Sequence, residues 1–266
     1  MDLTDPILTE KLIQNLYERV QYHEQILQRL YLMIVVGSWL VRAKIKTFHE
    51  IFEDLIEMSS AIQSSQRGLF LRSYILQKIS YFIKNVEDYS ENTSTEQFVE
   101  VILTNFREMN KLWVRMQFQG RLRDFEKRKQ ERNHIRMLIG KNLVYLSNLG
   151  ETRLSQDIYN NQVLPVLLSQ AIASRDIVTQ DYLFECIVQV YNDEFHLNSQ
   201  PIYMAELAKA VPGVAVNSIL SGFIERIQEQ SIINYERNGK REDGDEKLEE
   251  GREVSQEKNL QLLQKV

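Results

Sequence analysis

Signals that begin α-helices recur along this chain, and three of the four intervals between the expected helix pairs are similar. Asp5-Pro6 is an N-cap followed by a first-turn proline, and Thr47 with Glu50 and Ser94 with Gln97 have the spacing of capping boxes. Helix pairs are expected to begin near Pro6, Phe48, Thr95, Ser155 and Ser199, at separations of 42, 47, 60 and 44 residues. Helix-pair solenoids of the HEAT and armadillo kind repeat at roughly 40–47 residues. The spacing favours such a solenoid, with a compact helical bundle as the alternative.

The scarcity of turn residues supports an all-α fold. The 266 residues include 10 Gly and 4 Pro, whereas β-sandwiches and barrels need many of both. We therefore predict a right-handed α-solenoid of HEAT/armadillo-like helix pairs over residues 1–235. Residues 237–253 hold twelve charged side chains, too polar a stretch to offset chain entropy by burial. Residues 236–266 are accordingly expected to form a charged, disordered C-terminal tail.

Charge and cysteine usage narrow the possible functions. The formal net charge is -5, whereas general nucleic-acid binders are usually basic, so no nucleic-acid partner is expected. The single cysteine, Cys186, excludes an internal disulfide and a multi-cysteine zinc site. The acidic N-terminus does not resemble a secretory signal. The uncharged run Leu30–Val41 has twelve residues, and a membrane span needs roughly 20.

Catalytic motifs are not evident, and we expect neither an enzyme nor a cofactor or metal site. His49-Glu50 resembles the start of a zinc-protease helix, but Glu53 stands where the second histidine is required. A capping box accounts for these residues better. Cys186 and His196 could be paired as nucleophile and base, but Cys186 lies in an apolar run, where a thiol packs as a small hydrophobe.

One segment is locally basic. Between residues 121 and 136 three acidic side chains accompany seven basic ones, which are Arg121, Arg123, Lys127, Arg128, Lys129, Arg132 and Arg136. Such a stripe could contact an anionic lipid surface or nucleic acid. The alternative is a solvated helix face with ion pairs along the helix.

Two local expectations concern packing. Core packing is the expected role of five large side chains at helical spacing, which are Met33, Trp39, Met109, Trp113 and Met116. Pro165 is expected to kink its helix, because proline removes a backbone donor and crowds the preceding turn.

Short segments in a fixed order resemble one family. Gln28-Arg29-Leu30-Tyr31-Leu32 resembles P-R-L-Y-L of the large α-solenoid subunit of retromer, the vacuolar protein sorting-associated protein 35 family. Further segments are similar to family motifs in the same order, namely Asp54–Met58, Arg67–Arg72, Glu108–Gln117, Glu185–Val190 and Asp193–Leu197. The resemblance covers about residues 16–234 and corresponds to the N-terminal part of the family solenoid.

The resemblance implies a non-enzymatic scaffold in endosome-to-Golgi and plasma-membrane retrograde transport. It implies a cytoplasmic protein peripherally associated with endosomes, with sorting nexins, a small endosomal GTPase and cargo tails as further partners. The family motif implies docking of the arrestin-fold retromer subunit through Arg29, Leu30, Tyr31 and Leu32. Of these, Leu30 and Leu32 are expected to pack inside the solenoid, and Arg29 is expected at its surface.

Two departures from the family pattern qualify what the resemblance implies. Gln28 replaces the motif's proline, which removes a fixed φ angle at the start of the helix and restores an N–H. The long C-terminal solenoid that carries the metallophosphoesterase-fold subunit is missing from this sequence, so that partner is not expected. A truncated regulatory competitor of retromer assembly is therefore an alternative to a working scaffold.

Overall fold

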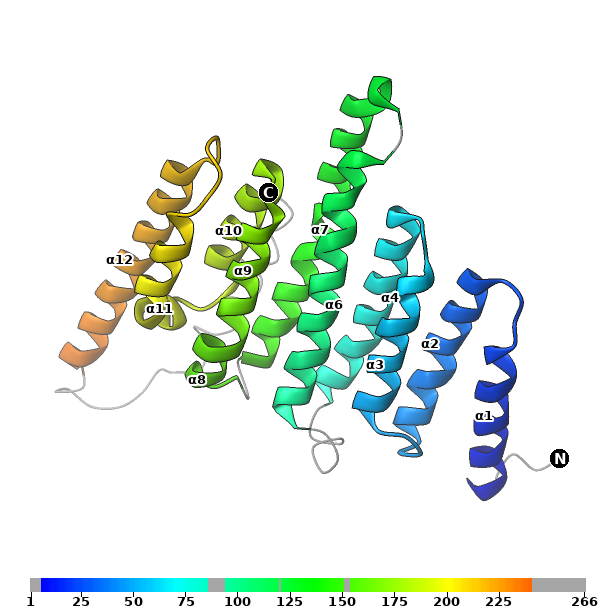
Figure 1. Cartoon of the computed structure of the whole chain (residues 1–266). Helices are drawn as coiled ribbons and strands as arrows, with labels where there is room; N and C mark the ends of the chain where they lie inside the picture. Colours follow the sequence, from blue (N-terminus) through cyan, green and yellow to red (C-terminus); the bar gives the residue numbers. More distant parts are fainter. Residues whose placement is uncertain (1–5, 86–93, 120, 151–153, 241–266) are drawn as a thin grey trace. The chain divides into compact units, whose positions relative to one another are not determined.

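The computed structural model describes residues 6–85, 94–119, 121–150 and 154–240, and in these ranges the chain is α-helical without a β-strand. It forms two compact units, residues Met1–Leu149 and Gly150–Val266. The all-α prediction is confirmed. In each unit successive helices pack in chain order as antiparallel hairpins, which is the arrangement of an α-solenoid (Figure 1).

The first unit is built from three helical hairpins. Its helices are α1 (Pro6–Gln21), α2 (Ile26–Arg42), α3 (Phe48–Met58), α4 (Ser65–Lys84), α6 (Thr95–Arg115) and α7 (Phe125–Gly150). Short 3-10 turns follow α3 at Ser59–Ala61 and α6 at Met116–Phe118, and another precedes α7 at Leu122–Asp124. Helix α2 contacts α1, α3 and α4, so α2 and α4 are neighbours from consecutive hairpins.

Both predicted capping boxes are present. The Thr47 hydroxyl accepts from the Glu50 N–H at 3.4 Å while the Glu50 carboxylate accepts from the Thr47 N–H at 3.3 Å. Ser94 and Gln97 make the same reciprocal pair at 3.3 and 3.0 Å. These bonds satisfy N–H groups that a helix start leaves without backbone acceptors. Helices α3 and α6 therefore begin where the sequence predicts.

A cluster of four phenylalanines forms the centre of the first unit. Phe48 lies 4.7 Å from Phe52, 5.6 Å from Phe82 and 4.2 Å from Phe98, measured between ring centroids. All four rings are at most 1% exposed. They come from α3, α4 and α6, so this cluster joins the second hairpin to the third.

Close helix contacts in this unit require glycine. A Cβ on Gly37 would lie 2.8 Å from Cγ2 of Ile51, and one on Gly68 would lie 2.9 Å from Cδ1 of Leu112. Real side chains do not approach so closely, so Gly37 sets the spacing of α2 and α3, and Gly68 that of α4 and α6.

The second unit is also a stack of helices. It contains α8 (Gln156–Ile158), a π-helical segment at Tyr159–Val163, α9 (Leu164–Ser174), α10 (Ile177–Val190), α11 (Asp193–Leu207) and α12 (Val216–Lys240). The irregularity expected at Pro165 takes the form of this π segment, and Pro165 itself lies in the first turn of α9, where proline is tolerated.

Two predicted boundaries differ from the structure. The helix expected to begin at Ser199 begins at Asp193, with Pro201 in its interior. Helix α12 continues to Lys240, beyond the expected end of the folded segment at residue 235. Residues 236–240 of the predicted disordered tail, 236–266, are therefore helical, and its remainder, 241–266, lies outside the described residues.

Candidate docking surface on α2 and α4

Helix α2 presents one narrow face to solvent. Its exposed or half-exposed side chains beyond the first two positions recur every three or four residues, at Gln28, Arg29, Tyr31, Leu32, Val35, Trp39 and Arg42. Positions three and four apart share a side of a helix. Most of the helix surface is therefore buried, and this single stripe is exposed to solvent.

The four predicted docking residues do not share one environment. Leu30 is 2% exposed, as expected for a packed side chain, whereas Leu32 is 44% exposed. The expectation that Leu32 packs in the core is wrong, because a two-residue step turns the side chain about 200° around the helix axis. Arg29 and Tyr31 are half-buried. Leu32 and Tyr31 are the members of this set that offer apolar surface to a partner.

Arg29 contacts the end of the preceding helix. Its Nη1 donates to the carbonyl oxygens of Gln21 at 3.4 Å and His23 at 3.5 Å. A guanidinium at a helix C-terminus satisfies carbonyls that lack backbone donors and opposes the helix dipole favourably. A substitution of Arg29 would therefore disturb the α1–α2 turn as well as any docking.

The replacement of the family proline by Gln28 does not displace the helix start. Helix α2 begins at Ile26, which makes Gln28 its third residue. The N–H groups of the first turn have no acceptor within the helix, so a residue with an N–H and a proline are both accommodated at this position. The Gln28 side chain is exposed, which places it on the same stripe as Leu32.

Aromatic and basic side chains of α2 and α4 meet on this face. The Arg42 guanidinium lies 4.7 Å from the ring centroids of both Trp39 and Tyr81, and the Lys78 ammonium lies 5.1 Å from the Tyr74 ring. The Tyr31 and Tyr74 rings are 5.5 Å apart, which links the two helices. We call Trp39, Arg42, Tyr74, Lys78 and Tyr81 the aromatic–basic stripe.

Trp39 corrects one packing prediction. It is 52% exposed, although Trp113 is fully buried and Met33, Met109 and Met116 are at most 4% exposed, as predicted. Helical spacing places a residue on a face but does not say which face is covered. Trp39 instead lies on the exposed stripe of α2, where the Arg42 guanidinium lies between its ring and that of Tyr81 on α4.

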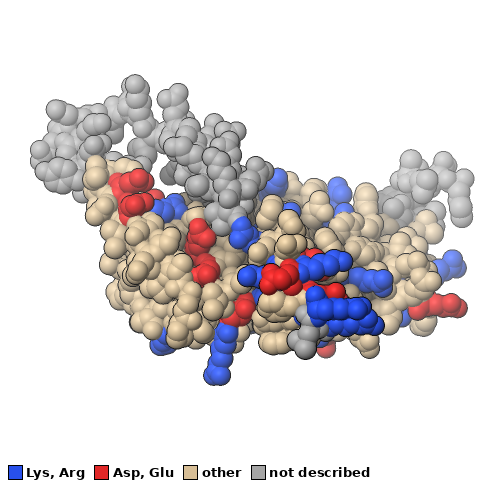
Figure 2. Space-filling view, turned by 90° about the horizontal axis from the view of Figure 1, so that it is seen from above, with Lys and Arg blue, Asp and Glu red and all other residues tan. Residues whose placement is uncertain are grey.

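The basic segment at the start of α7 is of mixed character. Arg121, Arg123, Lys127 and Lys129 are exposed, and Arg128 and Arg136 are half-buried. Arg128 Nη1 donates to the Arg121 carbonyl at 2.5 Å. In the space-filling view of Figure 2, red acidic side chains lie among the blue basic ones, so the face seen there is not uniformly positive.

Arg132 does not belong to that exposed set. It is 4% exposed, its guanidinium lies 5.3 Å from the Trp113 ring, and its carbonyl accepts from Trp113 Nε1 at 3.0 Å. The prediction that Arg132 contacts an anionic surface is therefore wrong, because the side chain packs between α6 and α7. Asn105 Nδ2 of α6 also donates to Asn142 Oδ1 of α7 at 3.1 Å. This bond and the contacts between Arg132 and Trp113 hold α6 and α7 together as a hairpin.

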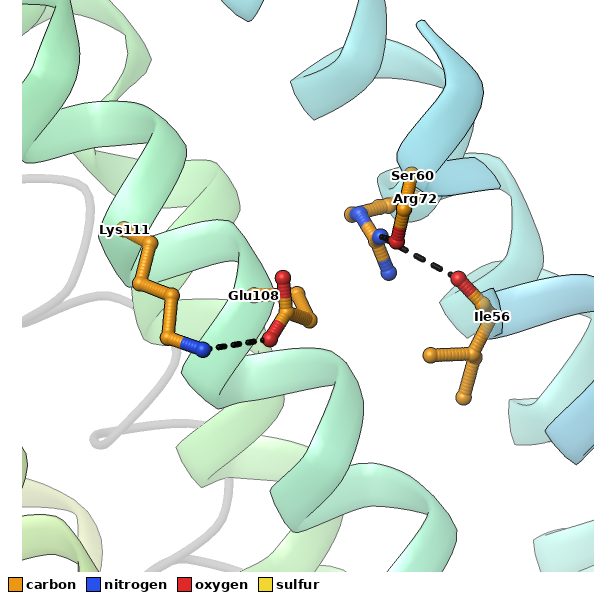
Figure 3. Close-up of polar contacts among 5 residues, drawn as sticks. All are labelled: Ile56, Ser60, Arg72, Glu108 and Lys111. Carbon is orange, nitrogen blue, oxygen red and sulfur yellow. Dashed lines mark hydrogen bonds and ion pairs between the residues drawn. The ribbon is translucent and has the colours of Figure 1, made fainter. Parts of the chain in front are cut away.

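Arg72 supports the α4 face from inside. It is 1% exposed, and its Nη2 donates to the Ile56 carbonyl and the Ser60 hydroxyl, both at 3.1 Å (Figure 3). Burial lowers the pKa of Arg72, and the nearby Glu108 opposes that shift. Glu108 itself pairs with Lys111 at 2.7 Å. Arg72 thus ties the end of α3 to the middle of α4.

We expect Arg72→Lys to lower the free energy of unfolding of the first unit by about 1–3 kcal/mol, the usual cost of leaving buried polar groups unpaired. A lysine has no planar fork to reach both acceptors, and its ammonium is more strongly hydrated. Urea denaturation followed by tryptophan fluorescence measures this, because both tryptophans lie in the first unit. Lys111→Met, at an exposed pair, is the control and should change stability by less than about 0.5 kcal/mol. Equal midpoints for wild type and Arg72→Lys would contradict the assignment.

The residues considered above as catalytic or metal-binding candidates make structural contacts instead. Cys186 is fully buried, and His196 is 1% exposed with Nε2 3.1 Å from the Val188 carbonyl oxygen. His49 pairs with Glu53 at 3.1 Å beside the capping box. Within the described ranges, His, Cys, Asp and Glu side chains form no group of three or more suited to a metal ion. No helix in those ranges has the length and apolar character needed to cross a membrane.

Stacked helical hairpins define a helical-repeat protein, and the exposed aromatic, aliphatic and basic side chains on α2 and α4 form its candidate docking surface. Comparison with protein families matches residues 3–264 to "Vacuolar protein sorting-associated protein 35". The chain belongs to this family, and the resemblance predicted from the short motifs is confirmed.

Individual relatives agree with this assignment. The chain is 41% identical to vacuolar protein sorting-associated protein 35C of Arabidopsis thaliana over 84% of its own length and 28% of the relative. It is 38% identical to vacuolar protein sorting-associated protein 35 of Schizosaccharomyces pombe over 90% of this chain and 29% of the relative. The Dictyostelium discoideum protein of that name is 39% identical over 82% and 28%. The chain thus spans less than a third of the length of these relatives.

Proposed function

We propose that the chain acts as a non-enzymatic scaffold subunit of a retromer-like sorting complex in endosome-to-Golgi and plasma-membrane retrograde transport. It docks the arrestin-fold subunit through the first turns of α2 and works in the cytoplasm, at the endosomal surface, to which its partners hold it. Sorting nexins, a small endosomal GTPase and cargo tails are the further partners of this proposal.

Membership in the vacuolar protein sorting-associated protein 35 family is the observation that carries the proposal. The form of the α2 surface supports it. Leu32 is exposed beside the half-buried Tyr31, and both follow Gln28 and Arg29 in the segment that resembles the family docking motif. Tyrosine is among the residues that most often dominate the binding energy of protein interfaces, and the exposed leucine beside it adds apolar area that a partner can bury.

The division of roles within the motif follows from burial. Leu30 maintains the fold of the first unit, Arg29 holds the end of α1, and Leu32 with Tyr31 contacts the partner. Arg29→Glu would mix two effects, because it removes the bonds to the carbonyls of Gln21 and His23 and places a negative charge at a helix C-terminus. Leu32 is therefore the better residue for a test.

We expect Leu32→Asp to weaken binding of the purified arrestin-fold subunit at least tenfold, about 1.4 kcal/mol, because an aspartate would be desolvated in an apolar contact. Isothermal titration calorimetry with the whole chain measures the affinity. The matched control is Ile224→Asp, which introduces the same charge at a residue of similar exposure, 47%, on α12. Binding of the arrestin-fold subunit with unchanged affinity by Leu32→Asp would refute the docking site, and no binding by folded wild type would refute the scaffold role.

A further inference from the structure

Helices α2 and α4 lack acidic residues altogether. They are 17 and 20 residues long, with the sequences ILQRLYLMIVVGSWLVR and SQRGLFLRSYILQKISYFIK. Asp and Glu make up 37 of the 266 residues of the chain, a frequency at which these helices would hold about five. The basic residues of the two helices are Arg29, Arg42, Arg67, Arg72, Lys78 and Lys84. Apart from the buried Arg72, these basic side chains reach the surface of two helices that carry no carboxylate, in a chain of net charge -5.

The neighbouring helix shows that acidic residues are segregated rather than generally depleted. Helix α3 carries Glu50, Glu53, Asp54 and Glu57 within 11 residues and has neither lysine nor arginine. The four carboxylates lie on exposed positions of α3. Asp54 faces α1, since its charge contributes to raising the pKa of Tyr17, after the larger effect of burial. The basic side chains of α2 and α4 are thus kept apart from the carboxylates of α3.

The cations of the aromatic–basic stripe are held in place by rings. Arg42 lies between Trp39 and Tyr81, and Lys78 lies over Tyr74. The ion pairs found among the described residues do not include Arg42 or Lys78. A cation that already rests on an aromatic face loses less side-chain freedom when a carboxylate binds it. The stripe is therefore preorganised for an acidic group.

The aromatic members supply apolar surface beside these cations. Trp39 is 52% exposed and Tyr81 is 41% exposed. Trp, Tyr and Arg are the residues that most often dominate the binding energy of protein interfaces. We propose that the aromatic–basic stripe binds an acidic peptide segment of a partner protein, its carboxylates on Arg42 and Lys78 and its apolar side chains on Trp39 and Tyr81.

Two other anions fit this stripe less well. Single-stranded nucleic acid stacks its bases on broad open aromatic faces, but here one face of each of Trp39, Tyr74 and Tyr81 already carries a cation. The surface that stays exposed on Trp39 and Tyr81 suits the smaller apolar side chains of a peptide. A long polyanion or an anionic membrane would also meet the field of a chain with net charge -5, with only two stripe cations to attract it. A short acidic segment needs only the local charge that the stripe provides.

Fluorescence anisotropy tests the proposal on the whole chain. The probe is a short labelled peptide in which Asp and Glu alternate with Leu and Phe, and the comparison peptide has Lys at every acidic position. We expect the wild type to bind the acidic peptide at least tenfold more tightly than the basic one, with an affinity that falls as salt is raised. The double substitution Arg42→Glu with Lys78→Glu should lower the affinity for the acidic peptide at least tenfold.

A matched control separates the stripe from overall charge. Arg123→Glu with Lys127→Glu changes the net charge by the same amount at exposed positions of the first unit and should leave peptide binding unchanged. Equal losses in both double variants would overturn the proposal, as would a wild type that does not prefer the acidic peptide. Tighter binding of phosphatidylserine vesicles or a thymidine oligonucleotide through Arg42 and Lys78 would also overturn it. Leu32→Asp should still bind the acidic peptide. Failure of peptide binding can therefore be told apart from failure of the arrestin-fold subunit to dock.

Discussion

Phe48→Ala is expected to lower the free energy of unfolding of the first unit by about 3–5 kcal/mol, the usual cost of truncating a fully buried phenylalanine. Phe48 is 1% exposed and touches Phe52, Phe82 and Phe98. Removing its ring leaves a cavity between three rings, which keep their positions because each is packed on other sides. Because the free energy of unfolding of a domain is only about 5–15 kcal/mol, the substitution should remove a large part of the stability of the first unit.

The measurement and its control come from the same chain. Urea unfolding followed by tryptophan fluorescence reports on Trp39 and Trp113, both in the first unit. Phe70→Ala is the matched control, because Phe70 is 53% exposed on α4 and its removal should change stability by less than about 0.5 kcal/mol. A midpoint for Phe48→Ala equal to that of Phe70→Ala would show that the phenylalanine cluster does not stabilise the unit.

The second unit is expected to lose stability as the pH falls from about 6.5 toward 4. Burial, together with the charge of Arg226, lowers the pKa of His196 from 6.5 to about 4. The Val188 carbonyl accepts hydrogen bonds from both His196 Nε2 and Arg226 Nη1, so a second positive charge there is unfavourable. His196 also packs edge-on against Phe223, with centroids 5.5 Å apart.

The sign follows from proton binding. Between the two pKa values the unfolded chain binds a proton at His196 and the native chain does not, so acid favours unfolding. Above pH 6.5 His196 is neutral in both states, and the free energy of unfolding has its full value. By pH 4 up to about 3 kcal/mol of it is lost, at about 1.4 kcal/mol per unit of difference between the two pKa values. Asp193 has the opposite effect on stability. Burial raises the pKa of its carboxyl group, although Asp193 pairs with Arg226 at 2.8 Å. The native chain therefore binds a proton at Asp193 more readily than the unfolded chain, so acid favours the native state at this residue.

Urea midpoints measured by circular dichroism from pH 7 to pH 4.5 test this prediction. His196→Gln removes the titrating group and retains an amide donor for the Val188 carbonyl. The difference in stability between wild type and this variant should shrink as the pH falls, because the contributions of all other groups cancel. A difference independent of pH would mean that His196 is not held neutral by its surroundings.

Local signals along the sequence predicted the starts of helices well. The capping boxes at Thr47 and Ser94 depend on residues three apart, and the structure contains both. The helix that begins at Asp193 was expected at Ser199, and Pro201 lies in its interior. In this helix His196 contacts the Val188 carbonyl and the Tyr203 hydroxyl donates to the Phe184 carbonyl, contacts with α10 that no local sequence signal indicates.

Burial was less predictable than helix position, because it depends on which neighbour covers each face. Trp39 and Trp113 have similar apolar surroundings in the sequence, yet one is exposed and the other lies under Arg132. Arg132 belongs to a charged run, and its burial requires Trp113, 19 residues away. The aromatic–basic stripe also joins residues of different hairpins. The absence of acidic residues from residues 26–42 and 65–84 was the sequence signal that could have revealed it.

The π-helical segment at Tyr159–Val163 has a consequence for sequence alignment. A π-turn accommodates one residue more than the same length of α-helix, while Tyr159 and Val163 remain buried on either side. A relative that lacks one residue here can return to regular α-helical winding and still present the same faces before and after it. Single-residue gaps at this place should therefore leave the hairpin intact, whereas a gap within α10 would rotate every following side chain by about 100°.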